Sequence, residues 1–254
     1  MMVPISEQTV LITGAGRGLG AAIAEAFARD GARVAINYRA SREQAETLAL
    51  RLGSHTRAFQ ADVRDGGEVQ RMVAEVTASL GPPTTVVHNA LADFSFNGDA
   101  RSHLDALSWE EIAAHLDTAV KGALNLVRAV HPAMARHGFG RIITIGTNLF
   151  QNPVVPYHDY VAAKAALLSL TRTAAAELGS AGITVNMVSG GLLRTTDASA
   201  GTPEAVFDLI AANTPLRRVI TPQEVADTVL FFASPWARAV TGQNLVVDGG
   251  LVFN

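Results

Sequence analysis

Short runs of apolar residues alternate along the chain with longer segments in which apolar positions recur at helical spacing. The short runs are apolar throughout and rich in branched side chains, which indicates β-strands buried on both faces, whereas the periodic segments predict helices. The predicted strands cover residues 9–12, 33–36, 57–60, 84–88, 141–145, 183–188 and 244–247. The predicted helices cover residues 21–29, 41–52, 67–80, 108–136, 157–178 and 221–232.

This alternation predicts an α/β fold of Rossmann type. We expect a doubly wound parallel sheet of about seven strands, with right-handed crossovers and helices on both faces. No low-complexity linker or internal repeat interrupts the pattern, so we expect a single domain over residues 1–254. Residues 189–215 differ, because they are rich in Gly, Thr and Ser. A segment of that length is usually functional or disordered, and we expect a mobile lid that contains a short helix.

Composition and charge narrow the classes of function. Of the 254 residues, 48% are hydrophobic and 17% are charged, and the net charge is −3. This balance is typical of a soluble globular protein and, without a clustered basic face, argues against a nucleic-acid partner. The chain has no cysteine, which excludes disulfides and zinc–thiolate sites, and we expect no metal. Residues 1–8 do not resemble a signal peptide, and no apolar run approaches the ~20 residues of a membrane helix, so we expect a cytoplasmic protein with no membrane partner.

The first predicted strand leads directly into the sequence TGAGRGLG at residues 13–20, and a predicted helix follows. Glycines at such a place let the backbone turn tightly and approach a pyrophosphate, which the N-terminus of the helix stabilises. An ordinary turn between strand and helix is the alternative, but the position after the first strand of a doubly wound pattern favours a dinucleotide. The loop residues expected to bind it are Gly14, Arg17, Gly18, Leu19 and Gly20.

The end of the second predicted strand indicates which dinucleotide binds. An acidic residue there would bind the ribose hydroxyls and repel a 2′-phosphate, but the chain has NYR at residues 37–39. Arg39 and Arg17 therefore favour NADP(H) by charge pairing with its phosphate, although either arginine alone is compatible with a solvated surface position. After the third predicted strand, Asp62 and Val63 would suit the adenine, while Asp62 would also suit the cap of a turn.

Tyr160 and Lys164 lie one turn apart on the same face of a predicted helix. An ammonium near a phenol stabilises the phenolate, so we expect Lys164 to lower the pKa of Tyr160 from about 10 toward the working range. A tyrosine of this kind can donate a proton to a carbonyl or remove one from an alcohol. The alternative is a packed Tyr beside a snorkelling Lys. The chain has only 3 tyrosines, and its only lysines are Lys121 and Lys164, so chance placement at this spacing is improbable.

Over essentially its whole length the chain resembles the short-chain dehydrogenase/reductase family. Apart from the spacing of the glycine loop, the supporting motifs are Asn89-Ala90, Tyr160-x-x-x-Lys164, VTGQ at residues 240–243 and VDGG at residues 247–250. Two further sequences, GRIITIG at residues 140–146 and ITVN at residues 183–186, are most similar to those of the beta-ketoacyl-[acyl-carrier-protein] (3-oxoacyl-ACP) reductases.

The resemblance implies a role for each matching residue. Tyr160 would be the acid/base, and Lys164 would also hold the nicotinamide ribose. The family has a carbonyl-polarising Ser thirteen residues before the Tyr, and here Thr147 stands at that position. A Thr hydroxyl has the same hydrogen-bonding capacity, so we expect Thr147 to serve. Asn89-Ala90 matches a motif near the cofactor, and Thr195 matches the lid threonine that bonds the nicotinamide amide or phosphate.

Besides Thr147, four positions depart from the family pattern. Ala119 stands where the family has an Asn that holds a proton-relay water, so the relay must differ; His115, one turn earlier, is a possible substitute, but a surface position is expected for it. His88 and Leu91 replace an Asn and a Gly near the cofactor. Gly190 replaces a Pro at the base of the lid and should loosen it.

These features together predict an NADPH-dependent oxidoreductase that converts a carbonyl to an alcohol. The resemblance implies a 3-oxoacyl thioester on acyl carrier protein, as in fatty acid biosynthesis. Few basic residues flank the predicted site, and residues 94–107 are expected to reshape its entrance, so a small-molecule or acyl-CoA carbonyl substrate is the alternative. A non-catalytic dinucleotide-binding sensor is a third hypothesis. The resemblance also implies a homotetramer or homodimer, with the apolar tail at residues 251–253 either in the interface or in the core of its own subunit.

Overall fold

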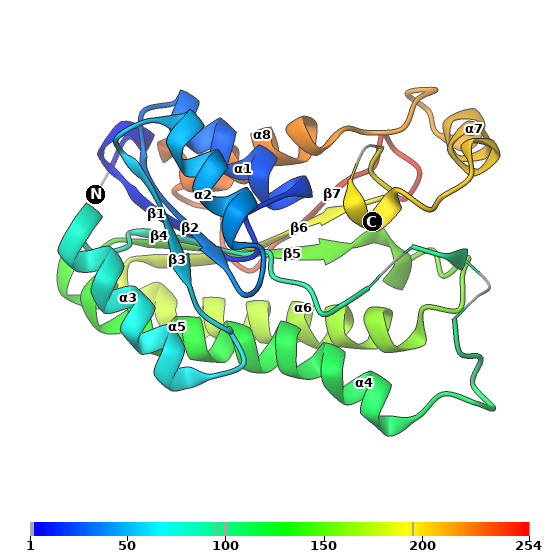
Figure 1. Cartoon of the computed structure of the whole chain (residues 1–254), viewed down its shortest axis with the longest axis horizontal. Helices are drawn as coiled ribbons and strands as arrows, with labels where there is room; N and C mark the ends of the chain where they lie inside the picture. The colour runs from blue at the N-terminus through cyan, green and yellow to red at the C-terminus, as the bar shows by residue number, and fades with distance from the viewer. Residues whose placement is uncertain (1–2, 95, 99–100, 195, 254) are drawn as a thin grey trace.

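The computed structural model describes residues 3–94, 96–98, 101–194 and 196–253. Within these residues, seven parallel strands form one sheet in the order β3-β2-β1-β4-β5-β6-β7 (Figure 1). The order reverses direction between β1 and β4, and ligands bind at such a switch point in open α/β sheets. The strands are β1 (Thr9–Ile12), β2 (Arg33–Tyr38), β3 (Thr56–Gln60), β4 (Thr85–His88), β5 (Gly140–Thr147), β6 (Ile183–Gly190) and β7 (Asn244–Val247).

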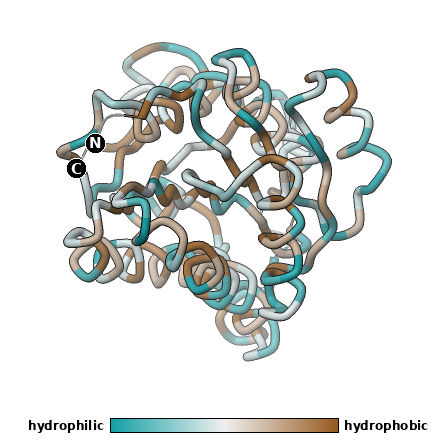
Figure 2. Tube along the Cα trace, turned by 90° about the vertical axis from the view of Figure 1, so that its left-hand side faces the viewer, coloured by the Kyte–Doolittle hydropathy of each residue, from teal (hydrophilic) through white to brown (hydrophobic). Residues whose placement is uncertain are grey.

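Helices cover both faces of the sheet. Figure 1 shows α1, α2 and α8 on one face, and α3, α4, α5 and α6 on the other. Their bounds are α1 (Gly18–Arg29), α2 (Arg42–Leu52), α3 (Gly66–Leu80), α4 (Trp109–Leu116), α5 (Gly122–His137), α6 (His158–Leu178) and α8 (Pro222–Ala233). The outer helical turns in Figure 2 alternate between brown and teal, the pattern of helices with one apolar and one polar side. The predicted fold class is therefore confirmed.

The predicted helix over residues 108–136 is not one regular α-helix. It begins with α4, whose first turn carries a capping box between Ser108 and Glu111. A π-helical turn, η3 (Asp117–Lys121), follows and leads into α5. A π-turn changes the hydrogen-bonding register of the backbone and is frequent at functional sites. Helical periodicity predicted the extent of this segment but could not show the irregular turn inside it.

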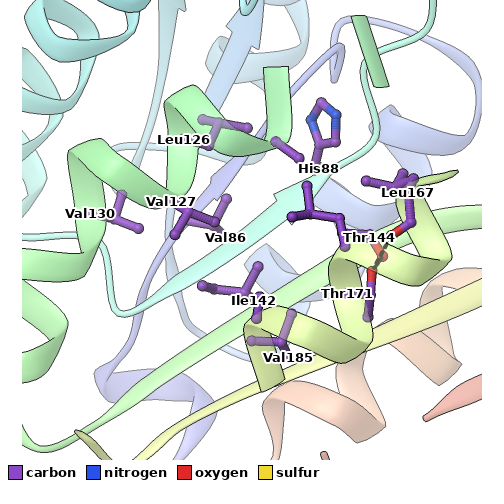
Figure 3. A pocket seen from close by; sticks show the side chains of 13 residues that line it. Val86, His88, Leu126, Val127, Val130, Ile142, Thr144, Leu167, Thr171 and Val185 are labelled. Carbon is purple, nitrogen blue, oxygen red and sulfur yellow. Dashed lines mark hydrogen bonds between the residues drawn. The ribbon is translucent and has the colours of Figure 1, made fainter. Parts of the chain in front are cut away.

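The core has an apolar layer on each side of the sheet. Alternate residues of β1 point to opposite layers, so that Val10 and Ile12 belong to one and Leu11 to the other. Phe27 and Phe232 join α1 and α8 in the first layer. In the second layer, strand side chains face α5 and α6 around a small apolar pocket (Figure 3). A hydrogen bond of 2.9 Å joins the hydroxyls of Thr144 and Thr171 beside it.

The segment over residues 189–215 begins inside the sheet and then leaves it. Strand β6 continues to Gly190, which pairs with Thr147 on one side and Val247 on the other. Beyond it lie a short 3₁₀ turn, η6 (Asp197–Ser199), and a helix, α7 (Glu204–Asn213). In Figure 1, α7 lies at the end of the molecule toward which the carboxyl ends of the strands point. The segment thus contains the short helix that its sequence predicted.

Candidate active site

The three predicted catalytic side chains lie together at the carboxyl end of β5. Thr147 is the last residue of that strand, while Tyr160 and Lys164 lie in the first two turns of α6. All three are buried, and the side chains of Thr147 and Tyr160 are joined by a hydrogen bond. Tyr160 and Lys164 share a helix face because they are four residues apart, and the sheet brings Thr147 to that face.

Lys164 is fixed by the strand beside it. Its Nζ donates a hydrogen bond of 2.6 Å to the carbonyl of Ile145 and lies 5.7 Å from the centre of the Tyr160 ring. Burial lowers the pKa of Lys164 from 10.5 to about 8, because the charged form loses hydration. A lysine held in this way carries a positive charge at neutral pH close to the tyrosine.

The expected lowering of the pKa of Tyr160 is wrong for this arrangement. Burial raises the pKa of Tyr160 from 10.0 to about 12, and the hydrogen bond with Thr147 opposes the shift only in part. Desolvation of the phenolate outweighs other influences because the ring is only 6% exposed. Tyr160 therefore carries its proton throughout the neutral range.

The glycine loop has the backbone that its sequence predicted. Gly14 and Gly18 have φ values of 62° and 56°, a region that glycine adopts without steric cost. A Cβ atom at Gly20 would lie 2.5 Å from the carbonyl oxygen of Gly14 and 2.7 Å from Nδ2 of Asn89, so only glycine fits there. The Asn89 amide donates to the carbonyls of Thr13 and Gly14 at 3.0 and 3.1 Å. This rigid cradle, followed by the N-terminus of α1, fits a pyrophosphate.

The two arginines expected to select NADP(H) each pair with an acidic residue. Arg17 lies 3.1 Å from Asp197, in the lid segment, and Arg39 lies 3.2 Å from Asp93, which follows β4. The side chains of both arginines remain substantially exposed. Surface ion pairs of this kind contribute about 0–1 kcal/mol, so they exchange readily for a phosphate.

The side chain of Asp62 is hydrogen-bonded within a turn. Its carboxylate accepts hydrogen bonds from the Arg64 guanidinium and backbone N–H, and these bonds lower the pKa of Asp62. Val63 is buried, and its carbonyl accepts a hydrogen bond from Asn125. Contact of Asp62 and Val63 with the adenine stays a prediction.

His88 and Ala119, both departures from the family pattern, contact one another. The Nε2 of His88 lies 3.0 Å from the carbonyl of Ala119, inside the π-turn, and therefore donates to it. Burial, together with the charge of Lys164, lowers the pKa of His88 to about 4, so the imidazole is neutral. Its Nδ1, 3.3 Å from the hydroxyl of Thr13, is then an acceptor. The same Thr13 oxygen accepts the backbone N–H groups of residues 89 and 90, so one network links the glycine loop to the π-turn.

His115 is not on the surface, as the sequence suggested, but buried. Its Nε2 lies 3.4 Å from Oδ2 of Asp159, a buried carboxylate that also pairs with Arg101. Burial lowers the pKa of His115, and Asp159 opposes this effect. Sequence reasoning missed both Asp159 and Arg101. The sequence did offer one signal for this pair, because Asp159 directly precedes Tyr160. A carboxylate next to a residue that is expected to be buried needs a partner.

Residues that follow β4 cover Tyr160. The Phe94 ring stacks on Tyr160 at 4.7 Å between centroids, and the Phe96 ring meets the Tyr160 ring edge-on at 5.9 Å. Leu91, from the same segment, is 37% exposed and lines a small pocket with Tyr160 and Lys164. Both phenylalanines belong to residues 94–107, which the sequence predicted to reshape the entrance of the site, and that effect on the entrance stays a prediction. Neither ring was predicted to contact Tyr160, since nothing local in the sequence indicates which surface it meets.

Two predictions about the lid remain open. Thr195 lies outside the described residues. Gly190 is held in the sheet ladder, so the expected loosening at the base of the lid stays a prediction. In the part of the chain that the structure describes, no helix is both long and apolar enough to cross a membrane.

The fold and this arrangement of side chains define an oxidoreductase that binds a nicotinamide dinucleotide. The sequence model of the enoyl-(acyl carrier protein) reductase family matches residues 14–252. The chain belongs to this family, which lies within the short-chain dehydrogenases/reductases that its motifs predicted, and it acts on CH–OH and C=O groups.

Relatives extend over nearly the whole chain. A 3-oxoacyl-[acyl-carrier-protein] reductase of Staphylococcus epidermidis is 34% identical and covers 96% of this chain and 98% of its own. A gluconate 5-dehydrogenase of Burkholderia cenocepacia, solved in complex with NADP and tartrate, is 30% identical with a TM-score of 0.86, over 96% of this chain and 94% of its own. A putative gluconate dehydrogenase of Agrobacterium tumefaciens is 28% identical with a TM-score of 0.89, over 98% and 97%.

Proposed function

We propose that this protein is an NADPH-dependent carbonyl reductase that converts a 3-oxoacyl thioester to the 3-hydroxyacyl thioester. The observation that carries the proposal is the meeting of Thr147, Tyr160 and Lys164 at one strand end, next to the glycine cradle. The full-length similarity to a 3-oxoacyl-[acyl-carrier-protein] reductase supports the substrate class.

In the proposed mechanism, the hydroxyls of Thr147 and Tyr160 bind the carbonyl oxygen of the substrate and polarise it. The bound nicotinamide supplies the hydride. The pKa of Tyr160, about 12, means that the tyrosine holds a proton to donate to the developing alkoxide, which suits the direction of reduction. The ammonium of Lys164 lies close enough to stabilise the resulting phenolate.

For the cofactor, we propose that the glycine loop binds the pyrophosphate and that Arg17 and Arg39 bind the 2′-phosphate of NADP(H). The absence of an acid at the end of β2 supports this preference, since Asn37 stands there and its Oδ1 lies 3.4 Å from the backbone N–H of Gly14. Lys164 would hold the nicotinamide ribose, and Thr195 its amide. A relative solved with NADP supports the same choice.

The carrier of the acyl group is proposed as coenzyme A or acyl carrier protein. Arg17 and Arg39, which lie near the site, are both paired with acids, so they offer little excess positive charge to an acidic carrier protein. We further propose a cytoplasmic homotetramer. The apolar side chain of Phe253 is 83% exposed, so it does not close the core of its own subunit and is available to an interface.

The test is the oxidation of NADPH, followed by absorbance, with acetoacetyl-CoA as substrate. We expect turnover by the wild-type protein and loss of at least about a hundredfold in kcat for Tyr160→Phe, because the proton donor is removed. Phe231→Leu is a control for the loss of an aromatic ring away from the site, since Phe231 is an exposed residue of α8. Crotonyl-CoA tests reduction of a carbon–carbon double bond, and gluconate with NADP tests the sugar-acid class. NADPH binding without turnover of any of these compounds would favour the sensor hypothesis instead.

A further inference from the structure

The covering segment after β4 forms an aromatic wall around the catalytic tyrosine. Besides stacking on Tyr160, the Phe94 ring meets the ring of Tyr157 edge-on at 5.2 Å and that of His115 at 5.3 Å. Phe96 lies 5.1 Å from Phe94 and 5.9 Å from Tyr157. We call Phe94, Phe96 and Tyr157 the aromatic wall. Edge-to-face and offset arrangements at these distances are favourable, so the three rings hold one another in place.

A column of stacked groups fixes the position of the wall. The guanidinium of Arg101 lies over the Phe94 ring, 4.6 Å from its centre, and the same ring stacks on Tyr160. Arg101 is itself held by Oδ2 of Asp159. The Oδ1 of Asp159 accepts the backbone N–H of Tyr160 at 2.8 Å. The column therefore begins and ends at the same turn of α6, which ties the covering segment to the catalytic residue.

The wall is also joined to the lid. The backbone N–H of Phe96 donates to the carbonyl of Ala198 at 2.9 Å, and the Thr202 hydroxyl donates to the carbonyl of Phe96 at 3.2 Å. On the other side, the N–H of Gly98 donates to the hydroxyl of Tyr157 at 2.7 Å. Backbone groups of Phe96 and Gly98 thus attach the segment, and the rings of Phe94 and Phe96 lie against Tyr160.

This chemistry distinguishes two classes of substrate. A polyhydroxylated acid brings several hydroxyls that must lose water, and each one left without a partner is costly. The aromatic rings offer no such partners, while the charged groups beside them, Arg101 and Asp159, are already paired with one another. An alkyl chain, in contrast, gains from contact with Phe94 and Phe96.

We infer that Phe94 and Phe96 are specificity-determining residues that select carbonyl substrates with an apolar acyl chain and exclude polyhydroxylated acids such as gluconate. The inference rests on the proposed function and adds the kind of acyl chain that the same site accepts. Arg101 and Asp159 are positioning residues, which act by holding Phe94 against Tyr160.

The test compares kcat/KM for acetoacetyl-CoA and for a longer 3-oxoacyl-CoA in the wild type, Phe94→Leu and Phe96→Leu. We expect the longer chain to be preferred, and Phe94→Leu to reduce that preference about tenfold, since apolar pockets discriminate by factors of this size. Phe94→Tyr should restore it. Phe231→Leu on α8, an exposed phenylalanine far along the chain from the site, is the control and should change nothing.

Arg101→Lys and Arg101→Met separate stacking from charge. Both variants lose the planar group over Phe94, but only the first keeps a cation for Asp159. We expect both to lose chain-length preference. Tyr160 should also become more accessible to water in them, which moves the basic limb of the pH profile of kcat/KM to lower pH. A merely structural role would lower stability without moving that limb.

Two failures can be told apart. If the wild type reduces 3-oxoacyl-CoA substrates but Phe94→Leu and Phe96→Leu leave the chain-length preference unchanged, the inference is overturned and the proposed function stands. If no carbonyl compound is turned over, the proposed function fails, and calorimetric binding to the NADPH-bound protein still tests the wall. Tighter binding of ethyl acetoacetate than of gluconate, with the difference reduced in Phe94→Ser, which replaces the apolar ring with a hydroxyl, supports the inference, and equal binding overturns it.

Discussion

Replacing Lys164 with Met tests how much the burial of its ammonium group reduces the stability of the folded protein. Burial lowers the pKa of Lys164 from 10.5 to about 8, so between these values the unfolded chain binds more protons than the folded one. The stability of the wild type should therefore rise with pH across this window. In full, the shift corresponds to about 3 kcal/mol, at about 1.4 kcal/mol for each unit of pKa. Lys164→Met has no such group, so its stability lacks this contribution.

The expected observation is a change in the difference between the two proteins. We expect the free energy of unfolding of Lys164→Met, relative to wild type, to fall by about 2 kcal/mol between pH 7 and pH 9.5. Lys164→Met also loses the hydrogen bond to the carbonyl of Ile145. This loss changes the difference in free energy of unfolding by the same amount at every pH, so the pH dependence of the difference is unaffected. Tyr160 is present in both proteins, and its own titration is common to them.

The assay is urea unfolding followed by circular dichroism at both pH values. Lys121→Met is a matched control, because Lys121 is the other lysine of the chain and is exposed. It should show no comparable change with pH. A difference between Lys164→Met and wild type that stays constant from pH 7 to pH 9.5 would refute the reasoning, since it would mean that Lys164 keeps an ordinary pKa in the folded protein.

Two further predictions concern substrate and cofactor. Thr147→Val keeps the shape of the side chain but removes the hydroxyl that binds the carbonyl oxygen, so we expect kcat/KM to fall about a hundredfold or more, while Thr147→Ser stays within a few-fold of wild type; equal activity of the Val and Ser variants would contradict this role. Asp197→Asn frees Arg17 and should tighten NADPH binding about two- to threefold without affecting NADH, as measured by calorimetry. Asp227→Asn, which removes one of the two acidic partners of Arg29 on α1, is its control, and an equal effect on both cofactors would argue against contact of Arg17 with the 2′-phosphate.

Much of the fold and part of the site could be predicted from local patterns. Each strand is a short apolar run and each helix a periodic one, so both can be recognised within a window of residues. The glycine loop and the pair Tyr160 and Lys164 are likewise local, because a fixed spacing on one element sets their geometry. Thr147 was reached through the family resemblance, and the structure places it beside Tyr160.

The features that were missed depend on contacts between distant parts of the chain. Arg101 and Asp159 are 58 residues apart, and neither sequence position indicates the other. Phe94 stacks on Tyr160 only because of the path of the segment after β4, which no periodicity describes. The pKa of Tyr160 follows from the same cause: this segment buries the ring, and burial outweighs the effect expected from Lys164. Local patterns thus predicted which groups lie together at the site but not the environment that shifts their pKa values.

The central claim is that this protein reduces the carbonyl of a 3-oxoacyl thioester. The most direct measurement is the transfer of deuterium to acetoacetyl-CoA from NADPH that carries deuterium at both C4 positions of the nicotinamide, with the product analysed by mass spectrometry. We expect 3-hydroxybutyryl-CoA carrying one deuterium at C3, formed at least about a hundredfold more slowly by Tyr160→Phe. Unlabelled or absent product with the wild type, or a label found only in a saturated thioester formed from crotonyl-CoA, would contradict it.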